Sequence, residues 1–192
     1  MTWDLPAGWR WTPLRELLLP VRTQLPPERI DADTLYLGLE HVQAGTGEYT
    51  GTRAGDAHLR SPKLAFEAGD VLYGKLRPNL RKCVVARTAG VCSIDLVPLR
   101  PVEPDAAHLL ALQMRSDPFT ADVLRLVGGV NLPRVTVRDL LTLALPVPPA
   151  ADRDRVHAVA QAATTLRRRY REVEQTVLDL EGYAAEVVLG LR

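Results

Sequence analysis

The chain has few of the cysteine and histidine patterns that identify a disulfide-rich or metal-binding protein. Its 192 residues include two cysteines, Cys83 and Cys92, which are too few for a disulfide framework. No group of cysteines and histidines has the spacing of a metal site, and the four histidines have no visible nucleophile partner. We therefore expect no metal and no cofactor, and we expect both cysteines to be small buried residues of neighbouring strands.

Long apolar runs and an excess of charge are also missing. The first residues form neither a basic region nor an apolar run, and no apolar run approaches the roughly 20 residues that span a bilayer. We expect a soluble, cytoplasmic protein. The net charge of +1 does not by itself indicate nucleic acid. The charge is uneven, however, because residues 71–90 hold five basic residues and no acidic residue.

No catalytic arrangement is complete either. Asp70 followed by Lys75 is similar to part of a metal-dependent nuclease core, which needs a second acid two residues before the lysine. Tyr73 stands in that place, and one carboxylate cannot hold a catalytic magnesium ion alone. There is no glycine-rich loop that could cradle phosphate. We expect a protein that is not an enzyme.

An unbroken apolar pattern runs through the last forty residues. Apolar side chains recur there at alternating steps of three and four, which is typical of a helix with a narrow seam for another helix. Such a helix would be roughly 60 Å long at 1.5 Å per residue, too long to lie on a domain built from the rest of the chain. The alternative is a surface helix folded back on its own core. The seam consists of Val156, Val159, Ala163, Leu166, Tyr170, Val173, Val177, Leu180, Ala184, Val187 and Leu191.

The charges of this helix indicate how two copies would pair. Its first half is rich in arginine and its second half is rich in acidic residues, so an antiparallel pair sets opposite charges side by side. In a fully overlapped register small residues face large ones, and Ala163 meets the partner's Leu180. Arg167 then flanks the partner's Glu174. We predict an antiparallel homodimer with one globular domain at each end.

The preceding residues 1–149 predict one α+β domain with a mainly antiparallel sheet and short helices, followed by the long coiled-coil helix in residues 150–192. Expected strands cover residues 35–39, 71–77, 82–87, 91–99 and 141–147. Expected helices cover residues 13–19, 105–115, 116–128 and 136–140. Short turns between residues 71 and 99 indicate an antiparallel ribbon of three strands. Trp9 and Trp11 could stack on bases, but core anchoring is the favoured role.

Two loops of this domain present side chains suited to DNA. Lysine and arginine displace counterions from phosphate, and arginine and asparagine also read guanine and adenine in the major groove. A basic turn that is merely solvated is the alternative for each loop. The candidate DNA-binding residues are Lys75, Arg77, Asn79, Arg81 and Lys82 in the first loop, and Asn131 and Arg134 in the second.

Several segments resemble one family in the order in which that family carries them. Residues 5–14, Leu-Pro-Ala-Gly-Trp-Arg-Trp-Thr-Pro-Leu, resemble the opening of target-recognition domains in specificity subunits of type I restriction–modification systems. Residues 37–42, 69–78 and 90–101 are similar to further family segments. Residues 146–149, Pro-Val-Pro-Pro, resemble its exit into a spacer helix.

This resemblance implies a non-catalytic DNA-reading subunit that holds methyltransferase subunits and, through them, a translocating nuclease. The usual family member has two recognition domains and two helices in one chain, whereas this sequence has one set. A half-length subunit that dimerises and reads a bipartite palindromic site fits that difference. The alternatives are a coiled-coil assembly adaptor of a related defence complex and a stand-alone DNA-binding regulator.

Overall fold

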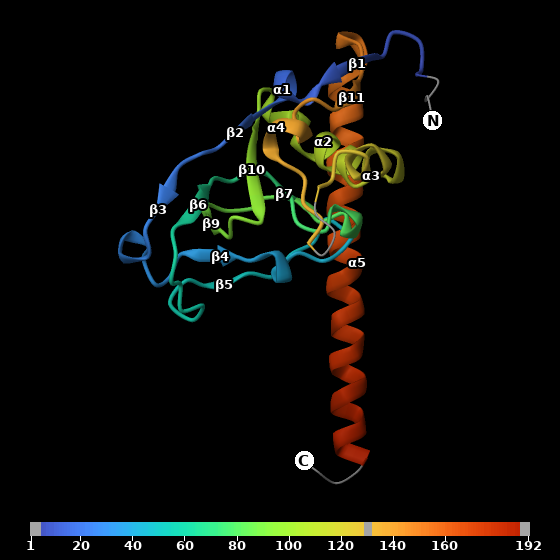
Figure 1. The fold of residues 1–192 in the computed structure, drawn as a ribbon. Coiled ribbons are helices and arrows are strands. Elements are labelled where there is room, and N and C mark those ends of the chain that lie inside the picture. The colour runs from blue at the N-terminus through green and yellow to red at the C-terminus, as the bar shows by residue number, and fades with distance from the viewer. Residues whose placement is uncertain (1–4, 129–131, 189–192) are drawn as a thin grey trace.

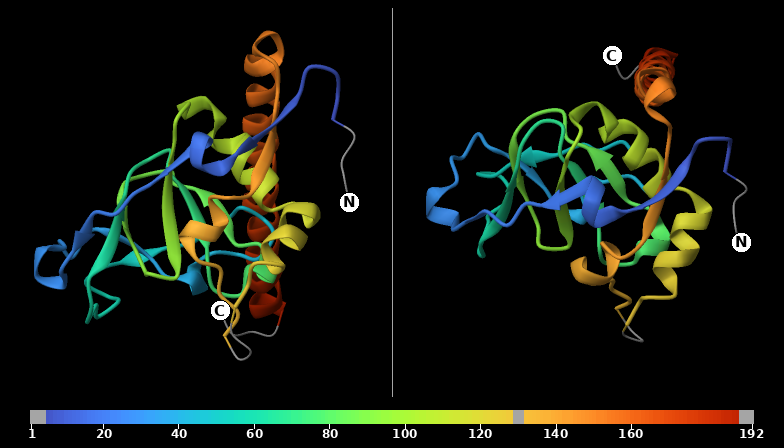
Figure 2. Two further views of the ribbon diagram at one scale, coloured as in Figure 1. Left: turned by 45° about the horizontal axis from the view of Figure 1, so that its top comes forward. Right: turned by 90° about the horizontal axis from the view of Figure 1, so that it is seen from above.

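Helix α5 (Arg153–Val188) runs alongside a domain of short strands and helices, and its second half projects beyond that domain (Figure 1). The computed structural model describes residues 5–128 and 132–188. Seen along its length, α5 stands at one edge of the domain (Figure 2). The predicted class is confirmed, since mainly antiparallel strands and short helices precede one long C-terminal helix.

The strands form three sheets. A two-stranded sheet joins β1 (Arg10–Pro13) to β11 (Ala144–Val147). The four-stranded sheet has the order β2 (Leu18–Pro20), β10 (Leu96–Pro101), β7 (Val71–Gly74) and β8 (Cys83–Val85). The five-stranded sheet has the order β3 (Gln24–Leu25), β6 (Lys63–Phe66), β9 (Gly90–Cys92), β4 (Leu35–Leu37) and β5 (Thr52–Arg53). Its β4–β9 pairing is parallel.

Short helices connect and cover these sheets. They are α1 (Leu14–Leu17), α2 (Ala107–Met114), α3 (Asp117–Leu124) and α4 (Val137–Leu140). Single turns of 3-10 helix are η1 (Pro27–Arg29), η2 (Leu39–His41), η3 (Pro78–Leu80), η4 (Pro104–Ala106) and η5 (Ala150–Asp152). Two of these helices begin with a side-chain cap, since the Ser116 hydroxyl accepts from the Phe119 amide and the Thr136 hydroxyl accepts from the Asp139 amide. No side chain caps α1.

Strand β7 lies between two hydrophobic cores. Successive side chains of a strand point to opposite faces, so Val71 and Tyr73 enter one core and Leu72 enters the other. The first core packs the four-stranded sheet against α2 and α3, where the rings of Tyr73 and Phe119 meet edge to face at 6.2 Å. The second core joins the four-stranded and five-stranded sheets. The segment that carries the first predicted DNA loop is therefore anchored on both faces.

The predicted ribbon of three consecutive strands is wrong in its third strand. Strands β7 and β8 form the expected hairpin, but residues 91–99 divide into β9 and β10, which enter different sheets. Gly90 explains the crossover, because a Cβ atom there would lie 2.6 Å from the Leu35 carbonyl oxygen. The missing side chain thus lets β9 approach β4 closely. Cys83 and Cys92 are buried as predicted, but they lie in different sheets.

The expected helix over residues 13–19 is also wrong in part. Only α1 is helical, and Leu18, Leu19 and Pro20 continue as β2, which pairs with β10. The tertiary pairing overrides the helical pattern because the Leu18 side chain is fully buried in the strand conformation. Core anchoring fails for Trp11, whose side chain is 47% exposed.

Candidate functional site: a nucleic-acid interface and a helix seam

The structure brings the two predicted DNA loops together. The Arg77 amide donates to the Pro133 carbonyl at 2.8 Å, and the Val135 amide donates to the Lys75 carbonyl at 3.1 Å. A bridge between Leu76 and Arg134 completes this contact. Segments more than fifty residues apart in the sequence therefore form one surface. Asn131 lies outside the described residues.

Two left-handed residues shape the first loop. Arg77 has a φ of 51° and Arg81 a φ of 53°, and they flank η3 on its two sides. A residue with a side chain pays about 1–2 kcal/mol for this conformation. The hydrophobic anchor of β7 and the bond from Arg77 to Pro133 offset that cost. The loop is consequently held in one shape, with Arg77 and Asn79 exposed to solvent.

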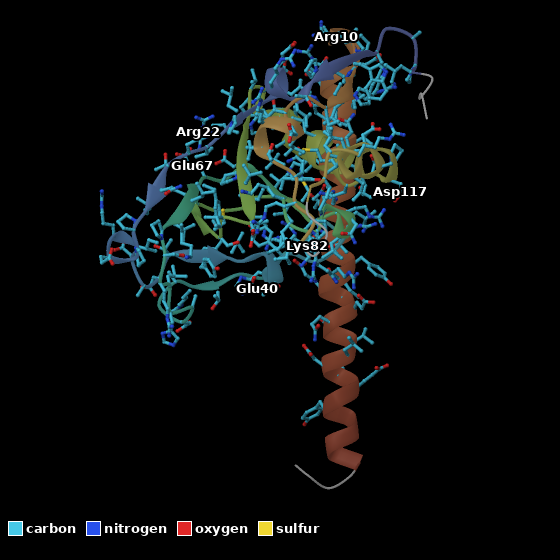
Figure 3. All side chains as sticks on the ribbon, viewed as in Figure 1. Arg10, Arg22, Glu40, Glu67, Lys82 and Asp117 are labelled. Carbon is cyan, nitrogen blue, oxygen red and sulfur yellow. The ribbon has the colours of Figure 1, made fainter. Side chains whose placement is uncertain are left out.

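The predicted DNA-binding cations differ in whether they form hydrogen bonds or ion pairs within the protein. The Lys82 ammonium donates to the Leu39 carbonyl at 2.8 Å, and Arg81 forms an ion pair with Asp117 at the start of α3. In contrast, the exposed Arg77 side chain has no ion pair or hydrogen bond to the described residues. In the view of Figure 3, Lys82 and Asp117 appear on the part of the domain away from Arg22.

Lys75 occupies an intermediate position at the inner end of the loop. Burial lowers the pKa of its ammonium, whereas the nearby Asp95 carboxylate acts in the opposite direction. The Lys75 amide donates to the Asp95 carbonyl at 2.8 Å. The cation is therefore set back from the surface, while Arg77 and Asn79 stand at its rim.

A third segment, which the sequence did not indicate, borders this surface. It is the turn of Ser93, Ile94 and Asp95 between β9 and β10. The Asp95 carboxylate accepts from the Arg134 guanidinium at 2.7 Å, and the Ile94 side chain is 59% exposed. An acidic residue 39 positions before Arg134 gives no local signal, so only the fold reveals the contact.

The predicted seam of α5 is exposed from Val159 to Leu180. Exposed fractions are 62% at Val159, 70% at Leu166, 64% at Tyr170, 63% at Val173, 47% at Val177 and 62% at Leu180. Val156 is half-buried and Ala163 is exposed. The side chains of Ala184 and Val187, and the whole of Leu191, lie outside the described part of the chain.

Another face of α5 packs against the domain. His157 and Ala160 are buried there, and α2 lies alongside. At about 100° per residue these positions lie well over 100° around the helix from Leu166 and Val173. The first half of α5 thus folds back on the core through one face and leaves the seam free on the other. The domain consequently sits beside the first half of the helix.

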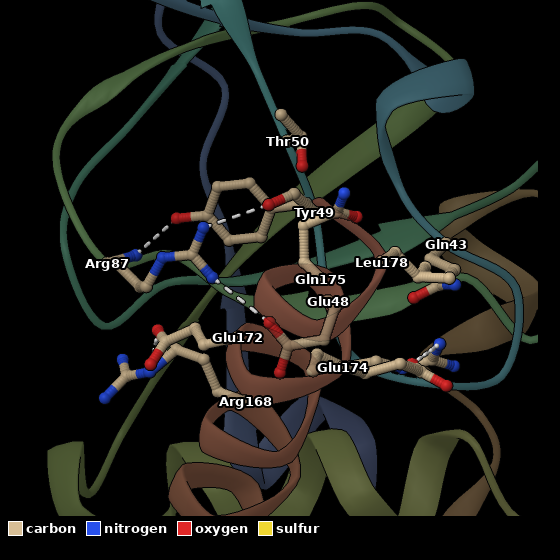
Figure 4. Close-up of a pocket in the computed structure, with 11 residues that line it drawn as sticks. Gln43, Glu48, Tyr49, Thr50, Arg87, Arg168, Glu172, Glu174, Gln175 and Leu178 are labelled. Carbon is tan, nitrogen blue, oxygen red and sulfur yellow. Dashed lines mark hydrogen bonds and ion pairs between the residues drawn. The ribbon is translucent and has the colours of Figure 1, made fainter. Parts of the chain in front are cut away.

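A cleft of about 760 Å³ separates residues 43–50 from the second half of α5 (Figure 4). Arg87 lies over the Tyr49 ring at 3.8 Å and pairs with Glu48 at 3.5 Å. On the helix side, Arg171 pairs with Glu174 at 2.8 Å. Each of these ion pairs lies on one wall of the cleft, so both walls carry neighbouring opposite charges.

The residues considered for nuclease chemistry are engaged in the fold. Asp70 is buried, and both of its oxygens accept from the Arg100 guanidinium, at 2.9 and 3.1 Å. Within residues 5–128 and 132–188 there is no group of three or more possible ligands that could hold a metal ion. Over the same ranges no helix is long and apolar enough to cross a membrane.

Comparison with known proteins gives one consistent result, although no family model matches the chain. The specificity subunit of the type I restriction enzyme EcoDI from Escherichia coli is 25% identical over 154 residues, which are 80% of this chain and 34% of that protein. The HsdS subunit of Thermoanaerobacter tengcongensis has a TM-score of 0.66 and 24% identity over 96% of this chain and 48% of its own.

Two further solved structures share the fold. A chain of a type I restriction–modification system has a TM-score of 0.64 and 24% identity over 97% of this chain and 49% of its own. The S subunit of M. genitalium has a TM-score of 0.60 and 13% identity over 91% and 43%. The chain thus spans about a third of the curated relative and just under half of each solved structure. In sequence and in fold, it resembles a type I restriction–modification specificity subunit, which confirms the resemblance drawn from its motifs.

Proposed function

We propose that the chain is the sequence-specific DNA-binding specificity subunit of a type I restriction–modification system. The joined loops carry this proposal most directly, because they gather arginine, lysine and asparagine from two distant segments on one rigid surface. Phosphate contacts from such a surface position the protein, and contacts to base edges supply the specificity. The proposed DNA-binding residues are Lys75, Arg77, Asn79, Arg81, Lys82, Asn131 and Arg134.

The exposed seam of α5 supports a second part of the proposal, an antiparallel homodimer. A regular apolar stripe that faces away from its own domain needs a partner, since contiguous exposed apolar surface marks interaction sites. A second copy matches it in spacing, in size and in charge. Residues 1–149 then form the DNA-reading unit and residues 150–192 the dimerisation and spacer helix.

The proposed subunit performs no reaction itself. It selects a DNA site and holds a methyltransferase subunit there, and a motor nuclease joins through that subunit. Because a two-fold dimer presents the same reading surface twice, its site consists of two inverted copies of one half-site. The protein does not read the base pairs between the two half-sites.

The test of this proposal measures binding of the full chain to duplexes selected from a random library, at several salt concentrations. Salt-dependent binding with a recovered bipartite sequence is the expected result. Dimerisation without any sequence preference would favour the assembly adaptor. Specific binding by a chain that never co-purifies with a methyltransferase would favour a stand-alone regulator.

A further inference from the structure

Asp95 is an acidic residue at the border of the surface that the two loops form. Its side chain is 28% exposed, and it points a carboxylate oxygen at the Arg134 guanidinium 2.7 Å away. A carboxylate beside phosphate repels it, so neither this half-buried acid nor Asp117, which pairs with Arg81, adds to phosphate affinity. The position of Asp95 therefore calls for a role beyond binding strength.

Arg134 is held in place from several directions. Its backbone exchanges hydrogen bonds with Gly128, the Arg134 amide donating at 3.2 Å and its carbonyl accepting at 3.3 Å. The backbone at Arg134 also forms an antiparallel β-bridge with Leu76 of the first loop. The side chain is 49% exposed and is fixed by Asp95 through one nitrogen. A long flexible side chain thus has a defined direction before any DNA arrives.

We infer that Asp95 is a positioning residue that orients Arg134 to read a guanine in the major groove; this inference rests on the proposed function. Arginine has five N–H donors, and Asp95 engages one nitrogen, which leaves others for guanine O6 and N7. A pre-oriented guanidinium loses less rotamer entropy on contact. Exposed Ile94 precedes Asp95 in the chain and exposed Leu132 comes two residues before Arg134, and both could offer an apolar contact to a thymine methyl group.

This role predicts a pattern that loss of folding would not produce. Asp95→Ala should reduce the preference for guanine at one position of each half-site by roughly tenfold, which lies within the range for a bidentate contact. Binding to random duplex should stay equal or become tighter, since a negative charge has left the surface. In an Arg134→Ala background the same change should have no further effect on that preference.

Asp117→Ala is the matched control, because it removes the acid that pairs with Arg81 on the same surface. It should leave the preference at the Arg134 position unchanged. Each variant is the full chain, assayed by selection from a random duplex library and by competition against random DNA. Asp95→Asn retains an acceptor oxygen and replaces the alanine variant if that variant unfolds, with a smaller loss of preference expected.

Two outcomes would overturn the inference, and they are distinguishable. If the wild-type chain selects a sequence and Asp95→Ala leaves every position of it unchanged, or weakens all positions equally, Asp95 does not position Arg134. If the wild-type chain selects no sequence at all, the proposed function itself fails and the inference fails with it.

Discussion

At the scale of single residues, the sequence indicates which side chains could bind DNA, but not which of them already form hydrogen bonds or ion pairs within the protein. Arg77, Arg81 and Lys82 look equivalent in the sequence, yet Lys82 is bonded to the Leu39 carbonyl and Arg81 to Asp117. The Arg77 side chain, by contrast, is exposed to solvent. Phosphate affinity should therefore depend most on Arg77, and stability should depend more on Lys82.

Replacing Arg77 with alanine should weaken binding to all duplexes and reduce the salt slope by about one unit, because one phosphate contact is lost. Titrations of random duplex at several salt concentrations would measure this slope. Arg22→Ala is the control, since that exposed arginine lies on a different part of the domain (Figure 3). An equal change of slope in both variants would place the phosphate surface elsewhere.

Stability should fall in mild acid because of His108. Burial lowers the pKa of its imidazole, and Arg115 and Arg168 act in the same direction. The unfolded chain therefore binds a proton near the ordinary pKa of 6.5 while the folded chain does not, and the free energy of unfolding falls as the pH drops through that value. Urea unfolding of wild type and His108→Gln at about pH 7.5 and 5.5 should show a smaller loss in the variant. His58→Asn is the control, because His58 is exposed, and it should lose as much stability in acid as the wild type. An equal loss in the wild type and in His108→Gln would exclude His108 as the cause.

At the scale of elements, local signals fixed helices and turns better than strand partners. Caps at Ser116 and Thr136 act within three residues, so the sequence carries them directly. The partner of β9 depends on Gly90 and a strand more than fifty residues earlier, and no local pattern specifies that pairing. The same limit hid Asp95, whose role appears only where three segments meet.

The apolar seam of α5 predicts a dimer, and charged side chains introduced into the seam should dissociate it. Replacing Leu166 and Val177 with aspartate should give monomers, because each buried layer would hold an unpaired charge. Sedimentation at tens of micromolar would measure the mass, with Gln161→Glu as control, because exposed Gln161 lies about 140° around the helix from Leu166. A wild-type chain that sediments as a monomer would rule out the homodimer.

The direction of the helices is tested by a charge exchange. Arg167→Glu should weaken the dimer by about 0.5 kcal/mol per exposed pair, doubled by symmetry, and adding Glu174→Arg should restore it. Glu174 also pairs with Arg171 of its own helix, so the comparison is between the single Arg167 variant and the double variant. No recovery in the double variant would contradict the antiparallel register.

At the scale of the whole molecule, the helix would set the distance between the two reading surfaces of the proposed dimer. The 36 residues of α5 span about 54 Å, equivalent to about 16 base pairs at 3.4 Å each. Since each domain packs beside the first half of its helix, the half-sites should lie closer than that limit, towards one turn of about 10 base pairs. A dimer built in this way reads a palindrome split by several unread base pairs.

Sequencing of modified bases in the DNA of cells that carry this chain and its methyltransferase tests the central claim most directly. The predicted result is a methylated motif of two identical half-sites in inverted orientation, separated by a fixed number of unspecified base pairs. An asymmetric bipartite motif, or a short continuous one, would contradict the symmetric dimer even if DNA binding were established.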